Sequence, residues 1–212
     1  MIKYGEFKKR VLHALQDDGG TYSDDLIYDA TVGAIDAILP WCGNHLVAEI
    51  EGDGETSLFE LPTNCYKVEG VLNVRTHQFA EKTVIGPVNK TRTQAVLDWI
   101  EWPQGFLNLY PEPPEGEKLQ VFYSAYYGHP SSASDVNYVL DFPHAALMGA
   151  LYWACAHCLV PGGISSARIR QYNIKTDSGI PTDNALEQSA TFLRKMFLDE
   201  MNRMPKQPGG VS

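Results

Sequence analysis

Residues 106–127 read FLNLYPEPPEGEKLQVFYSAYY, and this stretch decides the fold. Apolar residues recur at every second position over Phe106–Tyr110, a period that predicts a β-strand. A second run, Leu119–Tyr127, carries apolar residues at both parities, so both of its faces are expected to be partly covered. Prolines 111, 113 and 114 fall between the two runs, where a missing backbone donor disturbs no ladder. The stretch therefore predicts two strands of an antiparallel sheet with a proline-rich turn between them.

The same period of two extends upstream to Leu46. Gly52-Asp53-Gly54 separates the first two apolar runs and predicts a hairpin, because glycine and aspartate favour tight turns. Pro62 and Pro103 also fall between runs, while Pro87 lies near the end of one. The strands predicted upstream are Leu46–Glu51, Thr56–Leu61, Lys67–Thr76, Thr83–Val88 and Gln94–Trp102.

Helical periodicity replaces this pattern on both sides of the β-region. Ser23 followed by two aspartates marks a helix start, since serine accepts backbone N–H bonds and carboxylates suit the positive end of the helix dipole. Prolines and glycines mark the ends. The helices predicted are Lys3–Gln16, Ser23 to Pro40, Asp141 to about Val160, and Asn184 to Met204.

This order of elements predicts an α+β fold, a helical bundle of about four helices with a small antiparallel β-domain inserted in it. Residues 1–45 and 141–204 are predicted to form the helical core domain, and residues 46–130 the inserted β-domain. Residues 205–212 are predicted to be an extended C-terminal tail, because they cannot bury a core of their own.

The third predicted helix is apolar nearly all round, including the run Ala145–Val160. At about 1.5 Å per residue this run spans roughly 24 Å, short of the apolar thickness of a bilayer, about 30 Å. We therefore interpret it as a buried helix of a reduced, cytoplasmically made protein. A helix without a polar face must be covered on every side, and neighbouring subunits are expected to supply part of that cover.

The chain is acidic, with 26 Asp and Glu against 17 Lys and Arg and a net charge of −9. This balance argues against affinity for a phosphate backbone, although an acidic lumen would let DNA slide past without sticking. Carboxylates cluster on the predicted first hairpin. We interpret them as one solvated strand face, or as a face that lines the lumen if the protein forms a ring: Glu49, Glu51, Asp53 and Glu55.

Cys155-Ala156-His157-Cys158 places two thiols on one helix face and resembles half of a metal motif. A structural zinc needs four ligands, usually with a second pair spaced like the first, and no second pair exists in the sequence. Small apolar thiols in a packed helix are the favoured interpretation. A small Cys/His metal-dependent enzyme is kept as the alternative of a different class.

Catalytic patterns are also missing from the sequence. There is no G-x-S-x-G elbow, no G-x-G-x-x-G loop and no Walker loop in the right context. The prediction is therefore a protein with no catalytic residue, no bound metal and no cofactor.

The segment FLNLYPEP at 106–113, followed by LQVFY at 119–123, is similar to one in the head-to-tail adaptors of tailed bacteriophages. In that family a strand runs into P-x-P, a turn follows, and a second strand ends in tyrosines. The strand end Phe59-Glu60-Leu61-Pro62 and the pair of helices before the β-insertion also resemble the family, including the T7-like tubular protein that joins portal and nozzle.

This resemblance implies a non-enzymatic virion protein of the neck, made in the host cytoplasm. It would form a ring, usually of twelve copies, that lies under the portal, extends the DNA channel used in ejection and offers the tail or nozzle protein a platform. DNA would pass without sequence-specific binding, and no membrane would be involved. Another neck or tail-completion component is the alternative within the same class.

The resemblance also implies that the C-terminal helix and tail reach the portal. Basic residues there are the expected charge partners, with apolar residues beside them, in the set Arg194, Lys195, Phe197, Met201, Arg203, Met204 and Lys206. The candidates for contact between subunits are Tyr152, Trp153, Arg168 and Arg170.

Overall fold

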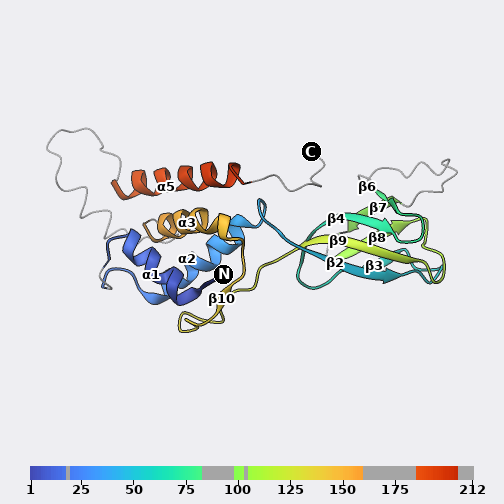
Figure 1. The fold of residues 1–212 in the computed structure, drawn as a ribbon, viewed down its shortest axis with the longest axis horizontal. Coiled ribbons are helices and arrows are strands. Elements are labelled where there is room, and N and C mark those ends of the chain that lie inside the picture. The colour runs from blue at the N-terminus through green and yellow to red at the C-terminus, as the bar shows by residue number, and fades with distance from the viewer. Residues whose placement is uncertain (18–19, 83–97, 103–104, 160–184, 205–212) are drawn as a thin grey trace. The chain divides into compact units, whose positions relative to one another are not determined.

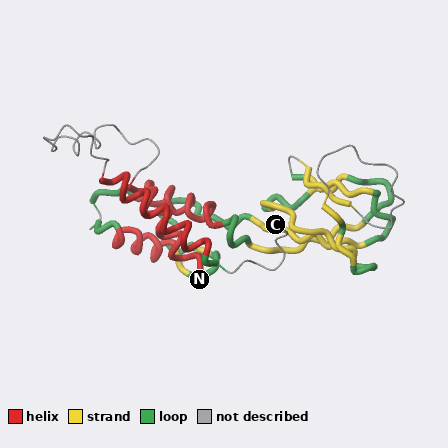
Figure 2. The backbone as a smooth tube through the Cα atoms, turned by 90° about the horizontal axis from the view of Figure 1, so that it is seen from above, coloured by secondary structure: helices red, strands yellow, loops and turns green. Residues whose placement is uncertain are grey.

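The computed structural model describes residues 1–17, 20–82, 98–102, 105–159 and 185–204, and these form two compact units. The helical unit contains Met1–Cys42 and the described residues from Tyr127 on, and the β unit is Gly43–Tyr126. Figure 2 shows the helices gathered in the first unit and the longer strands in the second. The predicted α+β class, with four long helices and antiparallel sheets, is confirmed.

The helical unit is built around α3, Leu147–Leu159, which packs against the three other long helices (Figure 1). Buried side chains of all four helices form one core, with Phe7, Ile35, Ala154 and Phe197 among its members. A two-stranded ladder of Ile2 with Leu140 and Lys3 with Val139 closes one side of the unit. The other elements of the unit are β1 (Ile2–Lys3), α1 (Tyr4–Ala14), α2 (Asp24–Ile38), β10 (Val139–Leu140), the short turn η1 (His144–Ala146) and α5 (Ala185–Asn202).

The start of α2 agrees with its prediction. The Ser23 Oγ accepts a hydrogen bond from the backbone N–H of Leu26 at 3.2 Å, and Asp24 and Asp25 occupy the first turn. A cap of this kind contributes about 1 kcal/mol to helix stability. The inward positions expected from the period are buried, as Ile27 and Ile38 illustrate.

The start of α3 differs from its prediction. The helix is preceded by the 3-10 turn η1, whose cap residue is Pro143 and which receives no side-chain cap bond. Asp141 lies before this turn, so the helix begins later than predicted. Cover for the all-round apolar helix comes largely from α1, α2 and α5 of the same chain, while Met148 is 44% exposed.

The β unit is a sandwich of two four-stranded sheets. One sheet has the order β2-β9-β4-β5 and the other β3-β8-β7-β6. Leu107 and Leu109 on one sheet and Leu119 and Val121 on the other are completely buried and form the core of the sandwich. The strands are β2 (Asn44–Glu51), β3 (Leu58–Glu60), β4 (Cys65–Asn73), β5 (Gln78–Phe79), β6 (Glu81–Lys82), β7 (Asp98–Trp102), β8 (Phe106–Tyr110) and β9 (Lys118–Ala125).

The predicted hairpin across Gly52-Asp53-Gly54 is wrong. β2 pairs with β9 in one sheet, whereas β3 pairs with β8 in the other. The chain passes from sheet to sheet at residues 52–57, and again at 111–117. The two crossings bind each other, because the Gly52 N–H donates to the Glu117 carbonyl at 2.8 Å and the Gly116 N–H donates to the Gly52 carbonyl at 2.9 Å. We call this double crossing the corner.

The corner has its own local bonds. The Asp53 carboxylate accepts backbone N–H bonds from Glu55 and Thr56 and a bond from the Thr56 hydroxyl. These contacts, with the Thr56 hydroxyl first, lower the Asp53 pKa to about 2. The glycine and aspartate thus turn the backbone as expected, but they direct it into a second sheet.

Two other predicted strands lie wholly or partly outside the described residues. Thr83–Val88 and the first part of Gln94–Trp102 lie outside the described residues. The short strands β5 and β6 precede that region, and β6 pairs with β7 in parallel while the remaining pairs are antiparallel.

Candidate functional site

The acidic residues predicted to face a lumen lie at and beside the corner. Glu49 and Glu51 are exposed on β2, and Asp53 and Glu55 are exposed on the crossing that follows. Exposed Glu112 and Glu115 belong to the second crossing. This end of the β unit is therefore strongly acidic. Among the described residues, no group of three or more His, Cys, Asp or Glu is arranged to hold a metal ion.

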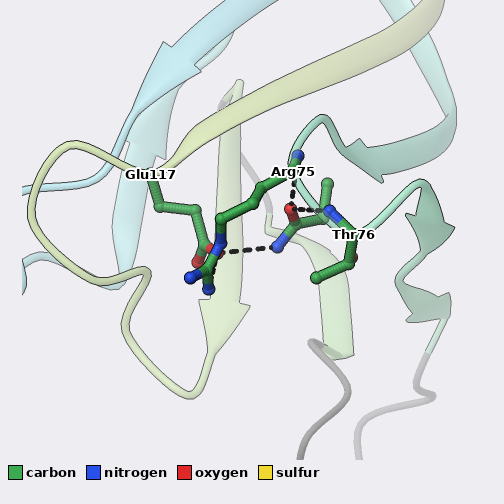
Figure 3. A network of polar contacts seen from close by, with 4 residues as sticks. Arg75, Thr76 and Glu117 are labelled. Atoms are coloured by element: carbon green, nitrogen blue, oxygen red, sulfur yellow. Dashed lines mark hydrogen bonds and ion pairs between the residues drawn. The ribbon is translucent and has the colours of Figure 1, made fainter.

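Glu117 is the exception among these acids, because it is buried. Its carboxylate accepts a hydrogen bond from the Asn73 side chain and pairs with Arg75, both at 2.9 Å (Figure 3). The Asn73 side-chain oxygen in turn accepts the backbone N–H groups of Arg75 and Thr76. The network holds the end of β4 against the corner, which is a structural role.

Neither Glu117 nor this network was identified from the sequence. The burial of Glu117 could have been predicted from its position. Glu117 stands two residues before the inward-facing Leu119, and side chains two residues apart in a strand point to the same side.

A second polar network lies on the outer face of the sheet that contains β2. The Glu69 carboxylate accepts the Ser124 hydroxyl at 2.6 Å and contacts His45 Nδ1 at 2.8 Å. The carboxylate stands between the serine and the histidine. A nucleophilic serine needs a base on its hydroxyl, oriented by a third group. His45 and Ser124 are cross-strand partners, but the Ser124 hydroxyl donates to Glu69, and the His45 Nδ1 contacts Glu69 as well. The histidine is thus not placed as the base on the serine hydroxyl, and the arrangement differs from that of a serine hydrolase.

The Cys155–Cys158 pair is buried in the core of the helical unit. Burial raises the pKa of each thiol from the ordinary 9.0 to about 12, and the neighbouring Cys155 adds to the shift of Cys158. A thiolate is needed to bind metal or attack a substrate, and these positions disfavour it. The geometry supports the interpretation as packed apolar thiols.

We expect the buried thiols to resist modification in the folded protein. Cys155 and Cys158 should react with a thiol reagent at pH 8 at least about tenfold more slowly in the native chain than in denaturant, because only the thiolate attacks. Mass spectrometry of trapped peptides measures both rates in one sample. The raised pKa values add stability that is complete below pH 9.0 and is lost as the pH rises toward about 12. Native modification at the unfolded rate would contradict this picture.

The residues predicted to meet the portal lie on α5 or after its end, and those that are described include both exposed and buried side chains. Arg194 and Lys195 are exposed, and Arg203 is exposed with an ion pair to Glu200 at 3.0 Å. Phe197 and Met201 are 2% and 1% exposed and belong to the core. Met204 is half-buried, and Lys206 lies outside the described residues. The apolar side chains that α5 does expose are Phe192 and Leu198, at 62% and 46%.

Two of the four residues predicted to contact a neighbouring subunit lie on α3, and the other two lie outside the described residues. Trp153 is half-buried and packs on Phe197 within the same chain, with ring centroids 5.1 Å apart. Half-buried Tyr152 lines a groove of about 630 Å³. Arg168 and Arg170 lie outside the described residues.

The groove is formed by the end of α1, by α3 and by the first half of α5. Its walls are mainly apolar, with Leu15, Leu151 and Phe192 among the lining residues. The polar groups in its wall are Gln16, Gln188 and Ser189, beside the Tyr152 hydroxyl. No acid–base pair converges there among the described residues, so the groove fits packing rather than chemistry.

The described part of the chain is thus a two-unit α+β protein. Its buried polar network stabilises the fold, and its Cys155 and Cys158 thiols are packed in the core of the helical unit. A family model described as SU10 adaptor protein matches residues 2–206, and the chain belongs to the SU10 adaptor protein family. The resemblance to phage head-to-tail adaptors is confirmed. The protein is accordingly a structural phage adaptor.

Two further observations belong with this result. No curated protein matches the chain. In the described part of the structure, no helix has the length and apolar character needed to cross a membrane.

Proposed function

We propose that this chain is the subunit of a ring of twelve copies in the neck of a tailed phage. The ring lies under the portal, extends the DNA channel and gives the tail or nozzle protein its platform. The family match over residues 2–206 carries this proposal. The buried thiols and the serine–carboxylate–histidine order support a structural role over a catalytic one.

The exposed acids at the corner suit a channel wall. Glu49, Glu51, Asp53 and Glu55 have carboxylates in solvent, so a ring that turned this end inward would present repeated negative charge. Such a surface repels phosphates and lets DNA move without binding it.

The exposed side of α5, with residues 205–212 after it, is the proposed portal contact. Arg194 and Lys195 supply positive charge, and Phe192 and Leu198 supply exposed apolar area. Phe197 and Met201 support this contact from the core by fixing α5 against α3. Aromatic and basic residues together are typical of the energetic centre of an interface.

Reversing both charges in an Arg194→Glu/Lys195→Glu variant should weaken binding to purified portal by about tenfold or more, since opposed charges at an interface become like charges. Deleting residues 205–212 should weaken it as well. Surface-immobilised portal and soluble adaptor give the dissociation constant directly.

Lys9→Glu is the matched control, because Lys9 is an exposed lysine of α1. It should leave portal affinity within about twofold. Unchanged affinity in both the double variant and the deletion would contradict the portal contact. A wild-type chain that never associates with portal or with itself would contradict the ring.

A further inference from the structure

The outer face of the sheet β2-β9-β4-β5 carries exposed apolar and aromatic side chains beside its polar network. Val47 is 52% exposed and Phe79 is 60% exposed, and Phe79 stacks on Phe122 with centroids 5.8 Å apart. Further along the same sheet Tyr66 and Tyr126, at 39% and 47% exposed, contact each other edge to face at 5.4 Å. We call these five side chains the first face.

The outer face of the sheet β3-β8-β7-β6 also carries exposed apolar side chains, beside exposed Glu60. Leu58 is 43% exposed and Tyr110 is 42% exposed. Phe106 is half-buried and points the same way, because it shares the parity of Tyr110 while Leu107 and Leu109 point into the core. We call Leu58, Phe106 and Tyr110 the second face.

An antiparallel sheet that faces water normally shows polar side chains on that side. Contiguous exposed apolar groups mark interaction sites instead, and tyrosine and phenylalanine are enriched in interfaces. The β unit has such groups on both sheets. Because the sheets pack face to face, the first and second faces lie on opposite sides of one sandwich.

We propose that the β units of neighbouring subunits stack in the ring, with the first face of one chain against the second face of the next. The inference rests on the proposed ring. A cyclic ring needs a heterologous contact, in which two different surfaces of the same chain meet. A portal or tail contact needs one surface, whereas two unlike faces on opposite sides of one unit match the requirement of a ring.

One possible ion pair and the rigidity of the surface support a second copy as the occupant. Exposed Lys67 lies on the same side of its sheet as the first face, and exposed Glu60 on the same side as the second face, so stacking can pair these two charges. Glu49 and Glu51 also lie on the side of Val47, toward the corner end of the edge strand β2. The bonds from Glu69 to Ser124 and His45 fix the polar part of the first face before any contact forms. A preorganised surface loses less entropy on binding.

Val47→Glu and Leu58→Glu test the two faces separately. Each places a charge in an apolar contact, so each should lower the fraction of full-length chain found in rings by about tenfold or more, alone or on portal. Native mass spectrometry measures that fraction. Val139→Glu is the matched control, because Val139 is 42% exposed on β10 in the helical unit, and it should assemble like wild type.

Mixing the two variants gives a sharper result. Val47→Glu keeps an intact second face and Leu58→Glu keeps an intact first face, so a cross-linked mixture should contain one-to-one pairs and no closed rings. Phe79→Ser and Tyr110→Ser form a milder second pair, and circular dichroism establishes that each variant is folded.

Rings from either glutamate variant in wild-type yield would overturn the stacking while leaving the proposed function intact. A mixture without pairs would also overturn it. Failure of the wild-type chain to assemble, alone or with portal, would instead contradict the proposed function and the stacking with it.

Discussion

Replacing Phe197 by alanine is expected to lower the free energy of unfolding of the protein by about 3–5 kcal/mol. The Phe197 ring is 2% exposed, and it packs edge to face on Trp41 at 5.6 Å and against Trp153 at 5.1 Å. Removing it leaves a cavity between α5, α3 and the Trp41 side chain. The loss should appear as a lower midpoint in chemical or thermal unfolding, followed by circular dichroism.

Phe192→Ala is the control on the same helix. Phe192 is 62% exposed, so its loss should change stability by less than about 0.5 kcal/mol. The comparison also distinguishes a residue of the core from a residue of the proposed portal contact. Phe192→Ala should weaken portal binding without changing the unfolding midpoint. Equal stability of the Phe197→Ala variant and wild type would show that α5 does not pack as described.

The second large effect is expected at Gly52 in the corner. A methyl group there would lie 2.5 Å from the Pro114 carbonyl oxygen and 2.6 Å from the Pro113 carbonyl oxygen. These are backbone atoms, so relief requires the two crossings to separate. Gly52→Ala should therefore cost about 1–3 kcal/mol or more.

The same substitution at Gly20 is the matched control, because a methyl group there meets nothing within 4 Å. Unfolding midpoints of the two variants should differ by several degrees. A Gly52→Ala protein as stable as the Gly20→Ala protein would mean that the crossings are not in close contact.

Much of the fold could be predicted because it depends on local pattern. The helices follow from apolar spacing, and the Ser23 cap follows from one side chain bonding a nearby N–H group. β8 has its predicted ends, and Leu107 and Leu109, two residues apart, are its buried positions. Local pattern also led to the expectation that both faces of Leu119–Tyr127 are partly covered. In the structure Val121 is in the core, whereas Tyr126 on the other side is 47% exposed, so cover of that side stays a prediction.

Strand partners could not be predicted in the same way. Gly52-Asp53-Gly54 specifies a turn, but the partner of β2 is β9, far along the chain, and the choice depends on the packing of two sheets. For the same reason the sequence did not separate exposed from buried positions on α5. Both Phe192 and Phe197 fit a helix, and only the position of α3 decides which of them is covered.

The β unit begins and ends at one point of the backbone, because Asn44 and Ala125 are direct partners across β2 and β9. The flanking residues of the helical unit are also tied together, since the Tyr127 hydroxyl donates to the Cys42 carbonyl. The sandwich is therefore an insertion whose first and last residues lie next to each other. A replacement for the sandwich has to match only this pair of ends, because the core of the helical unit is formed by residues up to Cys42 and from Tyr127 onward.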